Sequence, residues 1–276
     1  MAGTMDAVKA ESLIGVVATT LGKVATEQAP IVEGELLTDG SRFLGIIPPI
    51  VKSPVFAIRK KASAIIPLVE YERRGLMTRN QRRVIVRAIR EKKNIVVTGG
   101  TGSGKTTLVN GILHSIAEET PNDRVLIGED TREAQCSSPN HVFLRATKYV
   151  TLSDILAAML RMFPDRICIG EVRRGEAFDL LVAWNTGHPG GVVSIHSDIV
   201  LPRAALSRLE LMVSMSPVAP PSGEPIQRLI AEAVGLIVCV KREADGTRRV
   251  TQIVSVHGFK DGDYDLHVED ETHAED

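Results

Sequence analysis

The stretch TGGTGSGKTTLVNGIL, residues 98–113, constrains this chain more than any other because it joins an apolar run to a helical one through a glycine-rich turn. Gly99, Gly104, Lys105 and Thr106 satisfy the pattern G-x-x-x-x-G-K-[ST]. Glycines let backbone N–H groups turn toward phosphate oxygens, and the start of a helix adds a favourable dipole. The alternative is a strand-to-helix turn that binds nothing, but the whole motif in this context favours a phosphate-binding loop.

This loop predicts a nucleotide site in which each polar side chain has a role. We expect Lys105 to reach the β and γ phosphates and Thr106 to place its hydroxyl on Mg²⁺. A phosphate loop alone defines no reaction, because kinases, GTPases, helicases and motors all contain one. The residues expected to contact the nucleotide are Gly99, Gly100, Thr101, Gly102, Ser103, Gly104, Lys105, Thr106 and Thr107.

The chain after the loop has the alternation of an α/β protein. From Asn94 onward, apolar strands such as NIVVTG, RVLIGED, RICIGE and GVVSIHS alternate with helical segments, which indicates a mostly parallel sheet covered by helices. The later stretch LIVCVKREADGTRRVTQIVSV predicts a hairpin with Asp245 and Gly246 at its turn.

The first part of the chain predicts a smaller α+β domain. Apolar residues at helical spacing over 11–26 precede a stretch that alternates around Asp39 and Gly40, a hairpin signal, and SPVFAIRKKA adds a short strand. The expected organisation is a partial N-terminal domain at 1–66, a linker at 67–80, the main domain at 81–260 and a flexible acidic tail at 261–276.

Carboxylates and histidines near the ends of the apolar strands are the candidate reacting groups. Glu171 follows RICIG, where its carboxylate is expected to polarise an attacking water, although a glutamate at a strand end can also be a plain surface residue. Glu129 and Asp130 end another strand, with turn formation or helix capping as the alternative. His196 is a candidate for a hydrogen bond to the γ-phosphate and His188 a weaker one, since lone histidines at strand ends are more often structural.

Charge and cysteine usage exclude several function classes. A formal net charge of -1 gives no overall attraction to nucleic acid or to an acidic membrane. The basic run 73–93 has no aromatic residues to stack on bases, so a solvated helix face is favoured and direct DNA binding is not expected. Three cysteines lie far apart without a CxxC pair, which argues against a disulfide framework or zinc ribbon and for a reducing cytoplasm. The apolar run LIGVVATTL near the start is too short to span a bilayer.

Four motifs in this order resemble a known family, the ATPases of type II and type IV secretion. They are the phosphate loop GGTGSGKTT, the acidic box IGEDTRE, the variant Walker B segment PDRICIGEVRRGEA and the histidine box GHPGGVVSIHS. The resemblance covers roughly residues 30–260. The histidine box is similar to the conjugation and type IV branch, and the absence of a four-cysteine zinc module disfavours the type II branch.

The resemblance implies a RecA-like P-loop NTPase core and a PAS-like N-terminal domain, with the nucleotide between them. It also implies a homohexamer at the cytoplasmic face of the inner membrane, associated with other components of the secretion apparatus. Family members usually carry a longer N-terminal domain, so this one is expected to be incomplete. ATP and Mg²⁺ are the implied cofactors, and the implied metal ligands are Thr106, Glu129 and Glu171. The residues that the resemblance makes catalytic are Glu171, Glu129, Lys105, His196, Arg42 and Arg59.

The activity expected from the resemblance is that of a Mg²⁺-dependent ATPase motor, which drives transfer of DNA or protein, or pilus assembly, in a type IV secretion or conjugal transfer system. Arg42 and Arg59 match arginines that the N-terminal domain presents to the nucleotide, and without the resemblance they would be exposed basic residues on a hairpin. Three alternatives stay open: a nucleotide-gated assembly ring with negligible turnover, a pilus or type II secretion motor, and a translocase that itself grips DNA.

Overall fold

The computed structural model describes residues 5–60 and 64–269, which fall into two compact units. The division lies between Ser63 and Ala64, close to the boundary expected from the sequence. No helix among the described residues is long and apolar enough to cross a membrane.

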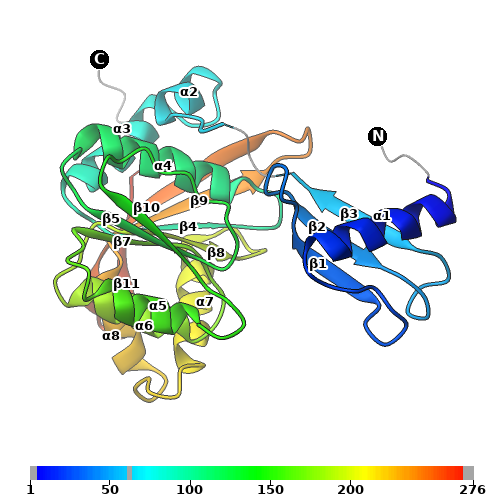
Figure 1. Ribbon diagram of the computed structural model, residues 1–276. Coiled ribbons are helices and arrows are strands. Elements are labelled where there is room, and N and C mark those ends of the chain that lie inside the picture. The colour runs from blue at the N-terminus through cyan, green and yellow to red at the C-terminus, as the bar shows by residue number, and fades with distance from the viewer. Residues whose placement is uncertain (1–4, 61–63, 270–276) are drawn as a thin grey trace. The chain divides into compact units, whose positions relative to one another are not determined.

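The N-terminal unit is a helix on a three-stranded antiparallel sheet (Figure 1). Its elements are α1 (Ala7–Thr20), β1 (Ile31–Glu35), β2 (Arg42–Ile46) and β3 (Val55–Arg59). The hairpin predicted around Asp39 and Gly40 is confirmed, since β1 and β2 pair in register on either side of it. Its core is formed by Ile14, Val32 and Phe43, which bury one face of the sheet under α1.

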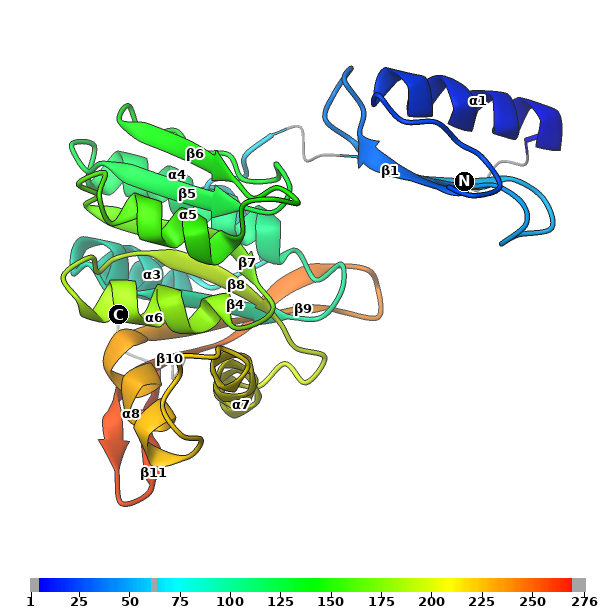
Figure 2. The ribbon, with the colours of Figure 1, turned by 60° about the horizontal axis from the view of Figure 1, so that its bottom comes forward.

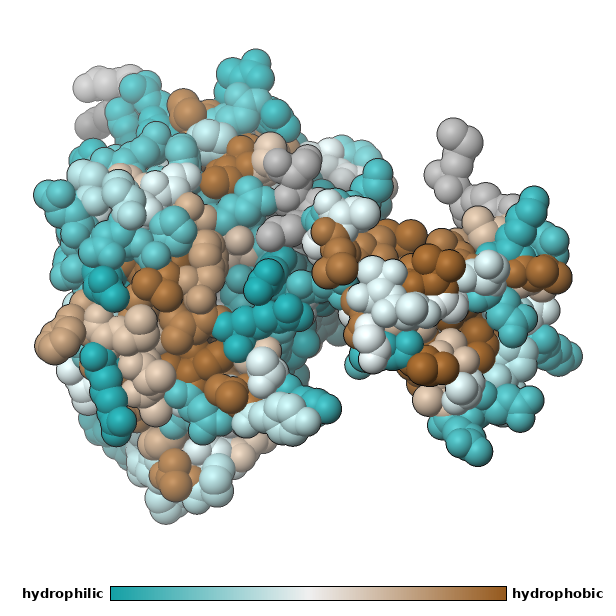
Figure 3. All heavy atoms as spheres, viewed as in Figure 1, coloured by the Kyte–Doolittle hydropathy of each residue, from teal (hydrophilic) through white to brown (hydrophobic). Residues whose placement is uncertain are grey.

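Apolar residues also lie on the surface of this unit. Figure 3 shows them as brown spheres, and Val16, Val24 and Leu37 are among the exposed ones. Large exposed apolar areas on soluble domains are often interaction surfaces. The exposed apolar residues of the small unit therefore form a candidate surface for contact with another protein.

The second unit contains an eight-stranded sheet in the order β11-β10-β9-β4-β8-β7-β5-β6. Strands β9, β4, β8, β7, β5 and β6 are parallel, and β10 pairs antiparallel with β9 and β11. The strands are β4 (Ile95–Gly99), β5 (Val125–Glu129), β6 (His141–Arg145), β7 (Arg166–Val172), β8 (Val192–His196), β9 (Leu236–Arg242), β10 (Arg248–Lys260) and β11 (Asp263–Val268). The helices are α2 (Leu68–Arg73), α3 (Arg79–Arg90), α4 (Lys105–Glu119), α5 (Leu152–Met159), α6 (Glu176–Asn185), α7 (Pro202–Ser214) and α8 (Glu224–Ala233).

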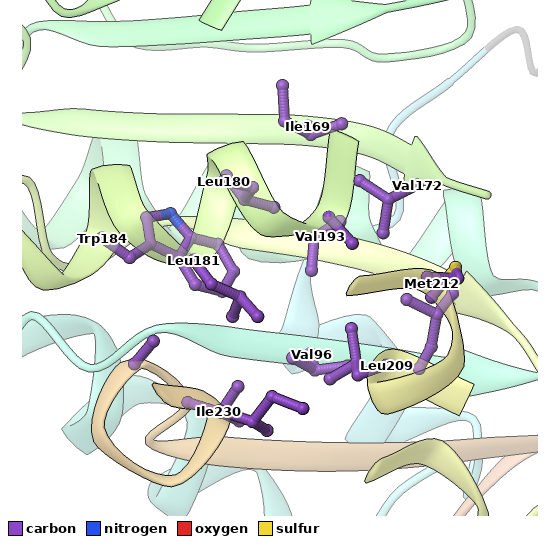
Figure 4. Packing of buried hydrophobic residues seen from close by; sticks show 14 of the residues in the cluster. Val96, Ile169, Val172, Leu180, Leu181, Trp184, Val193, Leu209, Met212 and Ile230 are labelled. Carbon is purple, nitrogen blue, oxygen red and sulfur yellow. The ribbon is translucent and has the colours of Figure 1, made fainter. Parts of the chain in front are cut away.

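Helices cover both faces of this sheet, which confirms the predicted α/β architecture. Helices α2, α3 and α4 pack on one face, and α5 to α8 pack on the other (Figure 2). The alternation of β4 supplies both cores, since Val96 joins the α5 to α8 side while Ile95 and Val97 join the α4 side. Figure 4 shows Leu181 and Trp184 of α6 packed in the first of these cores.

The expected linker at 67–80 is wrong, because this segment is part of the second unit. It contains α2 and the start of α3, and the side chains of Leu68, Tyr71 and Met77 are buried. The three side chains pack in the α4-side core. The many basic residues of this segment make its apolar face difficult to recognise in the sequence.

The expected flexible tail at 261–276 is also wrong where the structure describes it. Strand β11 pairs with β10 after a turn at Gly262, and Tyr264 is buried with its hydroxyl donating to Glu210 at 2.9 Å. Acidic residues alternate with the inward-facing ones in this strand, so its composition suggested a solvated end. Residues 270–276 lie outside the described part of the chain.

A fully buried arginine joins three segments at the amino ends of the parallel strands. Arg166, the first residue of β7, donates from Nε to Asp123 at 2.7 Å and from its two terminal nitrogens to the carbonyls of Gly190 at 2.8 Å and Ile89 at 2.9 Å. Burial of Asp123 opposes its ionisation, but the hydrogen bond and charge of Arg166 outweigh that effect and lower the pKa of Asp123. Gly190 has φ +85°, and a Cβ there would lie 2.6 Å from the guanidinium. Gly190 of the histidine box therefore has a structural role here.

We predict that Arg166→Met lowers the free energy of unfolding by about 3–5 kcal/mol, because the change removes the donor to two buried carbonyls and the closest cationic partner of the Asp123 carboxylate. Urea unfolding at neutral pH measures this. Because the folded pKa of Asp123 is lowered, the contribution is fully present above the ordinary aspartate pKa and is lost as the pH falls from there through the lowered folded pKa. The matched control is Arg203→Met, which removes an exposed pair with Asp263 and should leave the unfolding midpoint nearly unchanged. Equal losses in the two variants would contradict the prediction.

Candidate functional site

The glycine-rich segment forms the predicted loop between β4 and α4. Gly102 has φ +70° and Gly104 has φ +96°, values that residues with side chains rarely adopt. At Gly99 the reason for glycine is space, since a Cβ would lie 2.2 Å from the carbonyl oxygen of Val240 on the neighbouring strand. The loop is thus shaped by backbone conformation at two positions and by close packing at a third.

The lysine of the motif lies against the inner side of this loop. Lys105 Nζ donates to the carbonyls of Gly99 at 2.9 Å and Gly100 at 3.1 Å. The backbone N–H of Ser103 also donates to the Gly100 carbonyl, at 3.3 Å. An ammonium group and a backbone N–H therefore converge on the Gly100 carbonyl inside the loop.

Parallel pairing brings the other predicted residues to the same edge of the sheet. The carboxyl ends of β4, β5, β7 and β8 share one edge, where ligands bind in open α/β sheets. His196, the last residue of β8, lies opposite Gly99 in register, and Glu129 is the last residue of β5. The topology thus places the acidic box and the histidine box next to the phosphate loop.

Strand alternation also turns these side chains toward the face that α4 covers. Val125 and Ile127 of β5 pack in the α4-side core, so Glu129, two residues further on, faces the same way. Val192 of β8 packs there too, and His196 shares its parity. Both side chains therefore face the layer that contains the phosphate loop helix.

Glu171 reaches that face only because β7 contains a β-bulge. Ile169 pairs with Val193, but the next paired residue of β7 is Glu171, opposite Ser194, so Gly170 is the extra residue. Ile169 and Val172 both pack in the α5 to α8 core, whereas regular alternation would put them on opposite faces. The bulge therefore turns Glu171 to the α4 side.

The bulge is fixed by a side chain of the adjacent strand. The buried hydroxyl of Ser194 donates to the Gly170 carbonyl at 2.6 Å. The sequence led us to expect Glu171 just after its strand, but β7 continues to Val172. Glu171 therefore belongs to an ordered, bulged strand end.

The two predicted glutamates have different partners. Glu171 Oε2 accepts hydrogen bonds from Nε of Arg173 at 3.0 Å and from a terminal nitrogen of the same side chain, and this pairing raises the pKa of Arg173. Glu129 is 5% exposed, and its Oε1 accepts from the backbone N–H groups of Glu133 at 2.9 Å and Ala134 at 2.6 Å. Glu129 thus fixes the loop that follows β5.

That loop brings the carboxylate of Glu133 to the phosphate loop. The sequence did not predict Glu133 as a site residue. The hydroxyl of Thr106 donates to Glu133 Oε2 at 3.2 Å, and Asn110, one turn further along α4, donates to the Glu133 carbonyl at 3.3 Å. Asn110 also accepts from the backbone N–H of Gln135 at 3.0 Å. Glu133 lies inside the acidic box, but no spacing rule distinguishes it from its acidic neighbours.

Oxygen donors of this kind fit Mg²⁺. Thr106 and Glu133 supply a hydroxyl and a carboxylate in contact, which are the hard ligands that Mg²⁺ takes alongside waters and phosphates. Among the described residues, no group of three or more His, Cys, Asp or Glu side chains is arranged to hold a metal ion. The fit is therefore to a metal held jointly by protein and phosphate oxygens.

The two candidate histidines lie at opposite ends of β8. His196 Nε2 is 3.2 Å from Oδ1 of Asp198, beside the phosphate loop. His188 precedes β8 and its Nδ1 is 3.2 Å from the carbonyl oxygen of Pro164, which precedes β7. Of the two, only His196 lies at the edge of the sheet that carries the loop.

Arg42 and Arg59 belong to the N-terminal unit and are brought together within it. They lie opposite each other in register on β2 and β3, and Arg42 is also opposite Glu35 of β1. Arg59 is exposed and Arg42 is half-buried. Their approach to the phosphate loop, which is in the other unit, stays a prediction.

Comparison with known sequences identifies the family to which the chain is similar. The profile of the family described as "Type II/IV secretion system protein" matches residues 42–259. The probable conjugal transfer protein TrbB of Sinorhizobium fredii is 45% identical over 96% of this chain and 79% of its own length. The conjugal transfer protein TrbB of Rhizobium radiobacter is 44% identical over 99% of this chain and 83% of its own length.

Solved structures agree with the fold. The VirB11 ATPase of the Brucella suis type IV secretion system, solved with sulphate, aligns with a TM-score of 0.59 and 28% identity over 91% of this chain and 81% of its own. The ATPase DotB of Legionella pneumophila aligns with a TM-score of 0.62 and 18% identity over 92% of this chain and 70% of its own, a similarity of fold alone.

We predict that Gly99→Ala weakens binding of a fluorescent ATP analogue at least about tenfold, because the added methyl group must displace the end of β4 or the loop. Gly15→Ala, in α1 of the N-terminal unit, is the matched control, since a Cβ there would meet no atom of the described residues within 4 Å. Titration of the analogue measures both affinities, and thermal unfolding checks that both variants are folded. Similar affinities for the two variants would contradict the role of close packing at Gly99.

Proposed function

This chain belongs to the type II/IV secretion family, and from that premise we propose that it is a Mg²⁺-dependent ATPase that converts ATP and water to ADP and phosphate to power conjugal transfer or type IV secretion. The observation that carries the proposal is the convergence of Lys105, Glu171 and His196 at one sheet edge, on the face covered by α4. Family membership supports nucleotide hydrolysis in general, and this convergence supports the specific reaction.

The reaction proposed is in-line attack of water on the γ-phosphate. Glu171 would orient the water and accept its proton through Oε1, while Arg173 holds Oε2 in place. Thr106 and Glu133, with Glu129 and Glu171 as the neighbouring carboxylates, would hold Mg²⁺, which when bound neutralises charge on the β and γ phosphates.

Lys105 would exchange partners when a nucleotide binds. Its ammonium contacts two loop carbonyls, and phosphate oxygens would replace these weaker acceptors with charged ones. His196 would add a hydrogen bond to the γ-phosphate and so distinguish ATP from ADP. The phosphate loop thus supplies both binding and charge stabilisation in this proposal.

The small unit would contribute the remaining cations. Arg42 and Arg59 form a cross-strand pair of guanidinium groups, and an arginine brought to the γ-phosphate is worth about 10³ to 10⁵ in rate. Closure of the N-terminal unit on the nucleotide would then gate hydrolysis. Such gating would couple the chemistry to mechanical work.

We propose a homohexamer at the cytoplasmic face of the inner membrane, bound to other components of the secretion apparatus. The relatives named for conjugal transfer support transfer of DNA or protein, or pilus assembly, as the process served. The exposed apolar surface of the small unit supports contacts between protein surfaces. With a net charge of -1, direct grip on DNA is not part of the proposal.

A nucleotide-gated assembly ring with negligible turnover is the second candidate. It is favoured by the pairing of Glu171 with Arg173, which occupies one oxygen of the proposed base. Steady-state phosphate release by the purified protein separates the two functions, since only the motor sustains turnover.

We predict that Lys105→Ala and Glu171→Gln both abolish turnover, with a loss of about 10²–10⁴-fold expected for the general base. Only Glu171→Gln should retain tight ATP binding, because it leaves the phosphate ligands in place. Phosphate release and analogue titration measure the two effects. Glu118→Gln, at an exposed position near the end of α4, is the control with full activity. Equal turnover in Glu171→Gln and the unchanged protein would reject the role of Glu171.

We also predict that the protein assembles into a hexamer whose population rises with a non-hydrolysable ATP analogue, because nucleotide fixes the arrangement of the two units. Size-exclusion chromatography with light scattering measures the mass with and without the analogue. A strict monomer under both conditions, across the micromolar range, would undermine the ring and the motor.

A further inference from the structure

The hairpin of β9 and β10 lies against the outer side of the phosphate loop. Nε of Arg248, the first residue of β10, donates to the carbonyl oxygen of Gly102 at 3.0 Å. A Cβ at Gly104 would lie 3.0 Å from Cδ of Arg248, so the arginine stem runs along this glycine. Arg248 is 146 residues from Gly102 in sequence and lies outside the four motifs.

The charges of this hairpin are arranged unfavourably for its own stability. Arg248 lies directly opposite Arg242, and Arg249 directly opposite Lys241. Like charges at opposed positions of an antiparallel pair are destabilising. Lys241 has Glu243 at 3.7 Å, whereas Arg248 makes no ion pair with a carboxylate of any described residue. The arginine at 248 is therefore not explained by stabilisation of the hairpin.

The contact at Gly102 controls the direction of a loop peptide. The Gly102 carbonyl and the Ser103 N–H belong to one planar trans peptide, so they point in opposite directions. Arg248 holds the carbonyl on the outer side, and the Ser103 N–H crosses the loop to the Gly100 carbonyl at 3.3 Å. The hydrogen bond from Arg248 therefore keeps a backbone donor on the side where the loop would bind phosphate.

We propose that Arg248 is a positioning residue for nucleotide binding: it fixes the peptide between Gly102 and Ser103 so that its N–H faces the phosphates. This inference rests on the proposed nucleotide-dependent function. The flanking glycines fit this role, since Gly102 takes a positive φ and Gly104 leaves room for the arginine stem. The group required at position 248 is an N–H donor at the place of Nε.

Two substitutions of similar shape separate the hydrogen bond from the charge and the packing. Arg248→Met keeps an unbranched stem over Gly104 but has no donor. Arg248→Gln places an amide nitrogen where the arginine has Nε, so it restores the donor without the positive charge. Arg249→Met is the control, because the adjacent residue faces the other side of the strand and makes no hydrogen bond to the loop within the described residues.

The full-length protein is titrated with a fluorescent ATP analogue, and KM and kcat for phosphate release are measured in parallel. We expect Arg248→Met to raise Kd and KM about tenfold, the size expected for one lost hydrogen bond to a charged donor, with kcat within about twofold. Arg248→Gln should recover Kd to within about threefold of the unchanged protein. Arg249→Met should match the unchanged protein.

Two results would overturn the proposal while leaving the proposed function intact. Unaltered affinity in Arg248→Met would show that the contact does not position the loop. Equal weakening in the Met and Gln variants would show that the charge, and not the hydrogen bond, is what counts. Failure of the unchanged protein to bind the analogue at all would overturn the proposed function and this inference with it.

Discussion

The close approach of β4 and β9 at the end of the central strand is the constraint on which the site depends. Gly99 ends β4 with the carbonyl oxygen of Val240 in the place of a side chain, and His196 pairs with it on the other side. The loop therefore begins from a backbone fixed by both neighbouring strands. This fixed backbone sets the position of Lys105 relative to the carboxylates of the adjacent strands.

Strand β7 is seven residues long, with a stabilising residue at its start and a proposed catalytic residue near its end. Its first residue, Arg166, is buried and satisfied by Asp123 and two carbonyls, which ties the amino ends of the sheet to α3. Its other end carries Glu171 beyond the bulge. A sheet held this firmly at one edge can carry several charged side chains close together at the opposite edge, where the proposed reaction needs them.

The sequence predicted the parts of the fold that depend on local pattern. The phosphate loop, the alternation of strands and helices and both hairpins follow from spacing, and the structure contains them. It did not predict Glu133 or Arg248, because their partners Thr106 and Gly102 are brought close only by tertiary folding. Helix α2 and strand β11 were missed, and a linker and a flexible tail were predicted in their place, because charged residues concealed their apolar faces.

The bulge at Gly170 makes pairing register as important as side-chain identity. If Gly170 paired regularly opposite Ser194, alternation would carry the Glu171 carboxylate through the sheet to the layer of α5 to α8 and turn Val172 toward the phosphate loop. The face on which this carboxylate lies is thus set by one unpaired glycine. A relative could replace many side chains of β7 and keep the site, but it could not draw that glycine into the regular ladder.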